Sequence, residues 1–261
     1  MNLLFWNLHK NSIENFIADI ILENDVDVAI FAEYKQNNFS TVIDRLGNNY
    51  YKCENLPDAK TILLCKNTII AESKRDQDRY SLFTAELENT SYIIGGVHLT
   101  SALTGQEAKR LLEGRNLVTD LKLLEDRMGH TKSILIGDFN SSPFDSVMTV
   151  MDGINAVLFK DIIEDNEFAT VDHKRFRRLY NPTFHYISET GNNYGSIFYR
   201  DKMDTMYWYS FDQVLVRKTL ANAVSSVKYC RQIGAQSLVH GLYPQSTISD
   251  HLPLLVSILE G

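Results

Sequence analysis

The chain has 261 residues, of which 44% are hydrophobic and 23% charged, a composition typical of a soluble globular protein with a sizeable core. Its 26 basic and 33 acidic residues give a net charge of −7, which argues against a surface coated for nonspecific polyanion binding, but not against a local metal site. The three cysteines lack metal-type spacing and no apolar run is long enough to cross a bilayer, so we expect a cytoplasmic protein without membrane insertion.

Two apolar strands near the N-terminus each run into a polar residue. The first, Asn2–Leu8, has Asn7 near its end, and the second, Val26–Phe31, leads to Glu33. Between them, Asn11-Ser12-Ile13-Glu14 has the form of a capping box that precedes apolar residues at helical spacing. Strand, helix and strand in this order place Asn7 and Glu33 at the same edge of neighbouring strands. Asn7 is then either a hydrogen-bonded strand end or a ligand.

A series of short strands follows, and the turn signals between them predict a meander of antiparallel hairpins. These strands are Tyr50–Cys53, Thr61–Lys66, Ser81–Leu87 and Ser91–Val97. His98 closes the last strand, where it is either a structural histidine with satisfied hydrogen bonds or a functional one.

The longest helix is predicted to open with a second capping box, Thr104-Gly105-Gln106-Glu107, and to end at Gly129. Arg110 and Arg115 lie on it and could both reach a phosphate. We keep Arg115 as a candidate phosphate ligand, although most helix arginines are solvated or paired.

The central feature of the chain is Ser133-Ile134-Leu135-Ile136-Gly137-Asp138-Phe139-Asn140-Ser141-Ser142-Pro143. Its apolar part predicts a strand that is buried on both faces. Asp138 and Asn140 lie two residues apart at the end of this strand, so in extended geometry they project to the same side. Alone, this pattern also suits an ordinary turn.

Residues 161–211 are the least regular part of the sequence. A basic run at 173–178 contains Arg175, Arg177 and Arg178, and eleven of the 36 residues from Phe176 to Phe211 are aromatic. Basic side chains beside aromatic ones are typical of phosphate and base binding, but also of a solvated turn beside a small second core. We expect the segment from 173 to 209 to border the active site and to bind a phosphate-bearing substrate.

The C-terminal part adds three more polar residues at strand ends. Asp212 lies at the start of an apolar strand within Ser210–Val216, and Asp250-His251 precedes Pro253 and a last strand, Leu254–Leu259. No linker, repeat or low-complexity segment interrupts the chain, so we expect one domain over residues 1–261.

Collected together, the polar residues at strand ends are Asn7, Glu33, His98, Asp138, Asn140, Asp212, Asp250 and His251. Oxygen ligands without thiolates suit Mg²⁺ or Mn²⁺ rather than structural zinc. Histidines beside such an ion provide the acid–base groups that water attack on a phosphate ester requires.

With these motifs in this order, the sequence resembles the endonuclease/exonuclease/phosphatase superfamily, which includes pancreatic deoxyribonuclease, exonuclease III-type apurinic endonucleases, neutral sphingomyelinases and inositol polyphosphate 5-phosphatases. The resemblance extends over essentially the whole chain and is most specific in Gly-Asp-Phe-Asn and Ser-Asp-His. It implies an α/β (α+β) fold: a two-layer β-sandwich of mixed sheets flanked by helices, as in deoxyribonuclease I.

The resemblance also implies roles for individual residues. Glu33, helped by Asn7 and Asp250, would bind the divalent ion. Asp138 would deprotonate the attacking water, and Asn140 would hold that water or a phosphate oxygen. Asp212 would orient His251, which contacts the scissile phosphate. Whether His251 or His98 protonates the leaving group stays open.

Three hypotheses follow for function. The first is a Mg²⁺- or Mn²⁺-dependent phosphodiester hydrolase, a nuclease whose partner is nucleic acid. The second keeps the chemistry but changes the substrate to a lipid head group, an inositol phosphate or a small nucleotide; Trp208–Gln213 lacks the Pro-Ala-Trp-Cys-Asp-Arg motif of the inositol phosphatases. The third, a binding module without catalysis, is disfavoured because no expected ligand or acid–base position is replaced. The sequence indicates no protein partner.

Overall fold

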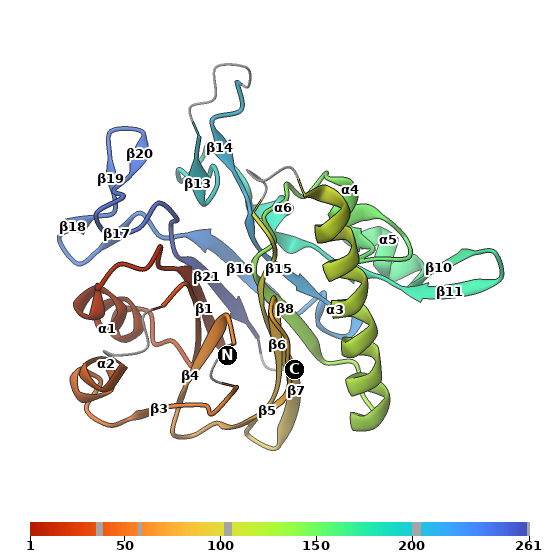
Figure 1. The fold of residues 1–261 in the computed structure, drawn as a ribbon, viewed down its shortest axis with the longest axis horizontal. Helices are drawn as coiled ribbons and strands as arrows, with labels where there is room; N and C mark the ends of the chain where they lie inside the picture. The colour runs from red at the N-terminus through yellow and green to blue at the C-terminus, as the bar shows by residue number, and fades with distance from the viewer. Residues whose placement is uncertain (35–38, 57–58, 102–105, 200–204, 260–261) are drawn as a thin grey trace.

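Two β-sheets stacked face to face form the centre of the molecule (Figure 1), which we describe from a computed structural model. The structure describes residues 1–34, 39–56, 59–101, 106–199 and 205–259. The first sheet has the strand order β16 (Val224–Tyr229), β21 (Leu254–Ile258), β1 (Asn2–Asn7), β2 (Val28–Ala32), β4 (Thr61–Lys66) and β3 (Tyr50–Lys52). The second has the order β5 (Ile70–Asp76), β6 (Tyr80–Leu87), β7 (Thr90–His98), β8 (Ser133–Asp138), β15 (Asp212–Val216), β12 (Leu179–Tyr180) and β9 (Ala156–Val157).

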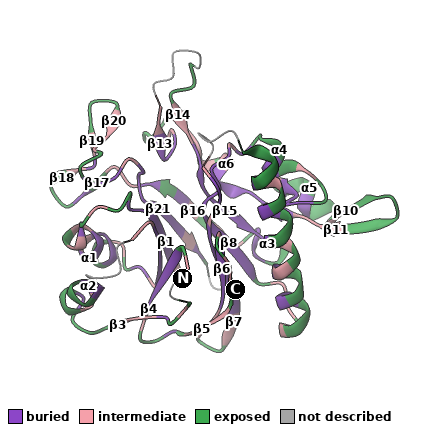
Figure 2. Ribbon diagram, in the orientation of Figure 1, coloured by how far each residue is buried: buried purple, intermediate pink, exposed green. Residues whose placement is uncertain are grey.

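Both sheets are mixed, as expected. The neighbours β1 and β2, β7 and β8, and β9 and β12 are parallel, and the other pairs within these two sheets are antiparallel. β8 is buried on both faces, because Ile134 and Ile136 belong to the core between the sheets while Leu135 belongs to a second core beneath a helix. Figure 2 shows the strands of both sheets mostly buried.

Helices flank the sandwich on its outer faces (Figure 1). They are α1 (Glu14–Glu23), α2 (Phe39–Arg45), α3 (Glu107–Met128), α4 (Ser146–Thr149), α5 (Lys160–Asp165) and α6 (Pro182–Tyr186), with a 3₁₀ turn at Lys218–Leu220. Ile17, Ile20 and Ile21 of α1 join the core that includes the first sheet. The leucines Leu117, Leu121 and Leu124 of α3 cover the outer face of the second sheet. No helix among the described residues has the length and apolar character that a membrane span needs.

The start of α1 lacks the cap that the sequence predicted. α1 begins at Glu14 without a side-chain cap, and the Asn11 amide instead donates hydrogen bonds to the carbonyl oxygens of Ser246 and Ile248, each at 3.0 Å. α3 begins at Glu107, also without a side-chain cap, and the predicted cap residue Thr104 lies outside the described residues. The capping-box pattern is therefore wrong at α1, because tertiary contacts recruit the amide.

The predicted meander is divided between the two sheets. β3 and β4 pair in the first sheet, whereas β6 and β7 belong to the second. Between β4 and β6 lies β5, an edge strand of the second sheet. The sequence pattern did not predict this strand, because its residues, Ile70–Asp76, are mostly polar. Polar edge strands limit edge-to-edge association, so the composition that hid β5 fits its position.

Four two-stranded hairpins project from this framework (Figure 1). They are β10 (Phe168–Val171) with β11 (Lys174–Arg177), β13 (Ile197–Phe198) with β14 (Trp208–Tyr209), β17 (Gln232–Ile233) with β18 (Gln236–Ser237), and β19 (Val239–His240) with β20 (Tyr243–Pro244). The part of the sequence that looked irregular supplies the first two of these hairpins.

Candidate active site

The polar residues predicted at strand ends meet at one edge of the sandwich. In the second sheet, Asp138 at the end of β8 lies beside His98 at the end of β7 and beside Asp212 at the start of β15. In the first sheet, Asn7 ends β1 beside Ala32, the residue before Glu33. Contacts between β1 and β8 join the two edges, so both sheets contribute to a single site.

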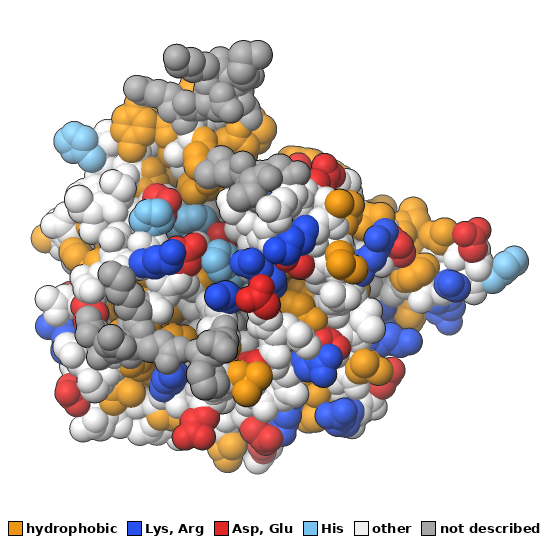
Figure 3. Space-filling model, in the orientation of Figure 1, with side chains coloured by type: hydrophobic (Ala, Val, Ile, Leu, Met, Phe, Trp, Pro, Cys, Tyr) orange, Lys and Arg blue, Asp and Glu red, His pale blue; other side chains and the backbone are white. Residues whose placement is uncertain are grey.

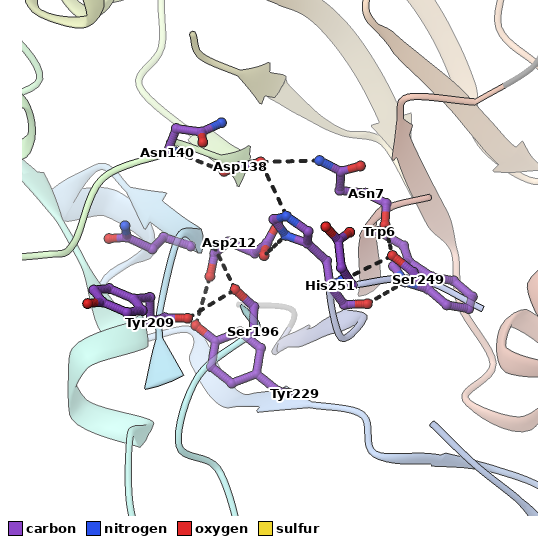
Figure 4. A network of polar contacts seen from close by, with 12 residues as sticks. Trp6, Asn7, Asp138, Asn140, Ser196, Tyr209, Asp212, Tyr229, Ser249 and His251 are labelled. Carbon is purple, nitrogen blue, oxygen red and sulfur yellow. Dashed lines mark hydrogen bonds and ion pairs between the residues drawn. The ribbon is translucent and has the colours of Figure 1, made fainter. Parts of the chain in front are cut away.

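Asp138 is the centre of this site and its side chain is buried. Its Oδ1 accepts a hydrogen bond of 2.8 Å from the backbone N–H of Asn140, and its Oδ2 accepts one of 3.2 Å from Nδ2 of Asn7 (Figure 4). The Nε2 atoms of His98 and His251 each lie 3.9 Å from Oδ2. Two hydrogen bonds and two imidazoles therefore fix the orientation of this carboxylate.

Gly137 allows β7 and β8 to approach closely enough for this arrangement. A Cβ atom at position 137 would lie only 2.1 Å from the carbonyl oxygen of Val97. A side chain there would push the two strands apart and would separate His98 from Asp138. The glycine of the Gly-Asp-Phe-Asn motif is thus a requirement of strand packing.

Asp212 and His251 form a buried pair, in which Asp212 Oδ2 lies 2.7 Å from His251 Nδ1. The backbone around His251 is also held. Its N–H donates to Ser249 Oγ at 3.0 Å, Ser249 Oγ–H donates to the Asn7 carbonyl at 2.7 Å, and Trp6 Nε1–H donates to the His251 carbonyl at 3.0 Å (Figure 4). The imidazole of His251 is therefore fixed both through its ring and through its main chain.

Asn140 adopts a left-handed backbone conformation with φ of 48°, which asparagine tolerates better than most residues. Its Nδ2 donates a 3.0 Å hydrogen bond to the carbonyl of Leu99. The local fold thus directs this amide toward the space beside Asp138.

Glu33 and Asp250 lie at the rim of the site and are half-buried. Oε1 of Glu33 is 3.6 Å from Nε2 of His98, which connects Glu33 to Asp138 through one imidazole. Oδ1 of Asp250 is 3.3 Å from Nδ1 of His9. Neither carboxylate forms a closed pair with an arginine or lysine among the described residues.

The crowding of carboxylates controls the protonation of the site. Burial alone lowers the pKa of His251, but Asp212, Asp138 and Asp250 outweigh it and raise the pKa to about 10. Burial, reinforced by Asp212, raises the pKa of Asp138, against the opposing effect of His251 and His98. His251 is therefore a fixed imidazolium at neutral pH, and Asp138 is a better proton acceptor than an exposed aspartate.

The donor set fits a hard divalent cation. Glu33, Asp138, Asp212 and Asp250 outnumber the two histidines, and Oδ1 of Asp212 and of Asp250 are buried without a hydrogen-bond partner in the described part of the chain. Oδ1 of Asn7 accepts one hydrogen bond, from the His9 N–H at 3.1 Å, and so retains one of its two lone pairs. Excess negative charge with oxygen donors suits Mg²⁺ or Mn²⁺.

Within the described residues, one close group of possible metal ligands is found, and it is not the predicted set of Asn7, Glu33 and Asp250. Asp138, Asp212 and His251 offer ligand atoms that all lie within 4.8 Å of one another. The 2.7 Å contact between Asp212 and His251 already uses Nδ1 of the imidazole, which favours an acid–base role for this trio.

The basic run at 173–178 does not border the site, and the placement predicted from the sequence is wrong. The hairpin of β10 and β11 projects away from the sandwich (Figures 1 and 2). Its base is held by Arg217, which follows β15 at the end opposite Asp212 and donates hydrogen bonds of 3.0 Å to the carbonyls of Arg177 and Arg178. Runs of charge show solvent exposure but not which end of a sheet they occupy.

The predicted substrate-binding arginines have local partners instead. Arg175 lies over the ring of Phe168 at 4.0 Å, Arg177 pairs with Glu167 at 2.9 Å, and Arg178 donates to the carbonyl of Asn166 at 2.7 Å.

Arg115 on α3 pairs with Asp152, with Nη2 at 3.0 Å and 3.2 Å from the two carboxylate oxygens. Arg115 is therefore paired with a carboxylate, which is one of the two ordinary states of a helix arginine.

The aromatic half of the same segment does reach the site. Ile197 forms a β-bridge with His251, and the Tyr199 ring lies 5.7 Å from that of Tyr209 and 6.0 Å from that of Phe211, the residue before Asp212. Burial, with the carboxylates of Asp138, Asp250 and Asp212, raises the pKa of Tyr199, so its phenol stays neutral. No pattern in the sequence divides the segment into a remote basic half and an aromatic half that adjoins the site.

Two residues that position Asp212 through its backbone could not be identified from the sequence. The Asp212 N–H donates to Ser196 Oγ at 3.2 Å, and the hydroxyl of Tyr229 donates to the Asp212 carbonyl at 2.8 Å (Figure 4). Neither belongs to a recognisable motif, because each acts through the backbone of another residue. Ser249 and Trp6 stand inside motifs that were noted, but their positioning roles appear only in three dimensions.

A family of known proteins matches this chain over nearly its whole length. The profile described as "Endonuclease/Exonuclease/phosphatase family" matches residues 4–251. The chain belongs to this family. Its members are hydrolases that act on phosphate esters. No curated protein sequence matches the chain.

Solved structures of the family share the fold at low sequence identity. The human Nocturnin catalytic domain, solved with a bound sulfate anion, is 16% identical with a TM-score of 0.63, and the match covers 98% of this chain and 92% of that one. A mannosyl-6-phosphatase from Bacteroides thetaiotaomicron is 12% identical with a TM-score of 0.68, over 100% of both chains. The endonuclease domain of the retrotransposon TRAS1 is 10% identical with a TM-score of 0.57, over 98% and 97%. These similarities establish the deoxyribonuclease I-like sandwich.

Proposed function

We propose that this chain is a divalent-metal-dependent phosphodiester hydrolase that acts as a nuclease. The observation that carries the proposal is the contact chain Asp212–His251–Asp138, in which a fixed imidazolium lies beside a buried carboxylate whose pKa is raised. A phosphate ester needs positive charge on its oxygens and a base for the attacking water, and this arrangement supplies both.

In this mechanism each residue has a defined task. Asp138 Oδ2 accepts the proton of the attacking water, which is favoured because burial has raised its pKa. His251, held as an imidazolium by Asp212, places a positive N–H against a non-bridging phosphate oxygen. The amide of Asn140 would hold the phosphate or the water. As the bond from phosphorus to the leaving oxygen breaks, His251 or His98 would give that oxygen a proton. The contact network leaves these groups little freedom, so little reorganisation is needed at the moment of reaction.

Glu33, Asn7 and Asp250 are the residues that would hold the metal ion. When bound, Mg²⁺ or Mn²⁺ supplies Lewis-acid polarisation of the phosphate. Glu33 lies 3.6 Å from His98, and Asp250 comes directly before His251, so these ligands would connect the ion to both histidines.

One observation favours a smaller substrate as the second candidate. A protein that follows a nucleic acid duplex spreads Lys and Arg along the groove. Here the densest basic run lies at the far end of β15, and the net charge is −7. A phosphatase or phosphodiesterase that acts on a small nucleotide, an inositol phosphate or a lipid head group needs no such groove. Among the similar structures is a mannosyl-6-phosphatase.

An activity panel tests the proposal. The purified protein is assayed with single-stranded DNA, RNA, sphingomyelin, inositol phosphates and mononucleotides, each with Mg²⁺, with Mn²⁺ and with excess chelator. We expect turnover of a phosphodiester with metal and none with chelator, and loss of at least about two decades of kcat in Asp138→Asn. Full activity in chelator, or an Asp138→Asn variant as active as the wild type, would contradict it.

A further inference from the structure

A second cationic centre lies beside the active site, at the end of β7. After His98 the chain continues through Leu99 and Thr100 to Ser101, and this short segment is flanked by Arg79, Lys109 and Arg110. The backbone carbonyl of Arg79 accepts the N–H of His98 at 2.8 Å, which ties the cluster to a site residue. Figure 3 shows Lys and Arg side chains gathered next to the histidines on this face.

Among the described residues, Glu113 is the one buried carboxylate that balances these cations. Glu113 accepts hydrogen bonds from the N–H and the hydroxyl of Thr100, at 2.9 Å and 2.6 Å, and lies 3.6 Å from Arg79 and 4.0 Å from Lys109. Asp78 makes a second contact with Arg79 at the surface. Glu113 is therefore already committed to the strand end and to the other two cations.

Arg110 is the exception within this cluster. Its side chain is 93% buried, since its relative exposure is 7%, yet no carboxylate lies within 4.0 Å of it among the described residues. Nη1 donates one hydrogen bond of 3.2 Å to the carbonyl of Ser101, and the buried Nε has no partner there. A buried guanidinium with five N–H donors usually has a planar anion that accepts several of them.

The position of Arg110 points to the source of that anion. It reaches Ser101, and Asn140 reaches the carbonyl of Leu99, so the two side chains approach the same three-residue segment. A substrate whose scissile phosphate lies between Asn140 and His251 would carry an adjacent anionic group toward Arg110.

We propose that Arg110 binds a second phosphate of the substrate, next to the scissile one. The substrate class is then a phosphate ester with neighbouring phosphates, as in a polynucleotide chain or at a polyphosphate end, rather than an isolated monoester. This inference rests on the proposed function of the site.

Direct anion binding tests the inference without catalysis. The melting temperature of the protein in chelator is measured as inorganic phosphate replaces chloride at constant ionic strength. We expect phosphate to stabilise the wild type, with at least tenfold weaker binding in Arg110→Gln. The control Arg115→Gln, on the same helix but paired with Asp152, should bind phosphate as the wild type does. An unaffected wild type, or equal binding by Arg110→Gln, would overturn the proposal.

A second variant covers the case in which Arg110→Gln does not fold. Arg110→Lys keeps the charge but loses the planar fork of donors, so phosphate binding should weaken by several-fold. Binding equal to that of the wild type would overturn the proposal.

Kinetics then identify the source of the second phosphate. Three substrates are compared: bis(4-nitrophenyl) phosphate, which has one phosphate, a DNA trinucleotide and adenosine diphosphate. Arg110→Gln should raise KM at least tenfold for a substrate with neighbouring phosphates, leave kcat within about twofold, and leave bis(4-nitrophenyl) phosphate unchanged. An effect on the trinucleotide alone assigns a polynucleotide, and one on the diphosphate alone assigns a polyphosphate end.

Equal losses on all three substrates would indicate a structural role and would overturn the proposal. If the wild type hydrolyses none of them, the proposed function fails, while phosphate binding at Arg110 is still decided by the melting experiment.

Discussion

At the scale of single residues, the site depends on side chains that are held by groups from distant parts of the chain. His251 is the clearest example, because Asp212 fixes its ring while Trp6 and Ser249 fix its backbone. A histidine without these contacts would lose charge on burial, as the effect of desolvation on its pKa shows. The function of His251 is thus set by its neighbours.

The substitution Asp212→Asn tests this dependence. It removes the largest opposing charge, so the pKa of His251 should fall from about 10 toward or below its ordinary value of about 6.5. Imidazole proton resonances followed by NMR during a pH titration in chelator measure the change directly. We also expect kcat to fall by about two decades or more while the fold persists. Asp172→Asn, in the exposed turn between β10 and β11, is the matched control and should change neither.

The sequence predicted which residues belong to the proposed site better than it predicted which of them are in contact. The sequence indicated Asn7, Glu33, His98, Asp138, Asn140, Asp212, Asp250 and His251 because each stands at the end of an apolar strand. It could not show that Asp212 and His251 are 2.7 Å apart, since 39 residues separate them. Arg110 and Arg115 looked alike in the helix, and only packing distinguishes the buried one from the paired one.

At the scale of elements, two of the ion pairs made by α3 have very different surroundings. Glu125 is buried against Arg217, with Oε1 2.8 Å from Nε, and also accepts a hydrogen bond of 2.7 Å from Ser133 Oγ. Burial lowers the pKa of Arg217, while Glu125 opposes that shift. The pair joins the C-terminal part of α3 to the start of β8 and to the end of β15, and thus fixes the helix on its sheet.

Glu125→Gln should therefore be strongly destabilising. The variant leaves the buried guanidinium of Arg217 without a counter-charge, which costs about 3 kcal/mol or more of unfolding free energy. Asp152→Asn breaks the half-exposed pair with Arg115 on the same helix and should cost at most about 1 kcal/mol. Urea unfolding of the two variants measures the difference. Equal losses would show that burial does not distinguish the two pairs.

The elements themselves could largely be predicted where periodicity was strong. The strand Thr61–Lys66 has the predicted bounds, and β1, β7, β8 and β21 differ from prediction by a residue or two at their ends. The polar edge strand β5 and the short helix α2 lacked a continuous apolar stripe, so pattern alone did not reveal them. The division of the meander between two sheets depends on tertiary packing, which local periodicity does not encode.

At the scale of the whole molecule, the residues of the proposed site come from both layers. Asn7 ends a strand of the first sheet and Glu33 follows another, whereas Asp138 and Asp212 belong to the second sheet. Carboxylates from both layers meet at this junction. A divalent ion held by Glu33, Asn7 and Asp250 would offset their negative charge and would bind only the folded chain.

Mg²⁺ should therefore raise the melting temperature. At one hundred times the dissociation constant, the stabilisation is about 2.7 kcal/mol, or roughly 5–10 °C for a chain of this size. Glu33→Gln should abolish most of this increment but keep the metal-free melting temperature within about 2 °C, because Glu33 is half exposed. Calorimetry with and without Mg²⁺ measures both. Glu189→Gln at an exposed position is the control and should respond to Mg²⁺ as the wild type does.

The pairing of β1 with β21 joins segments that are synthesised far apart in time. Trp6 and Asn7 leave the ribosome early, but the strand that covers the edge of β1 and the histidine that Trp6 binds are separated from them by about 250 residues. A nascent chain released before Leu254 would have an unpaired apolar edge, which invites aggregation, and one released before His251 would lack the imidazolium. The proposed site is therefore incomplete in any chain that stops before His251, although most of its other residues are already present.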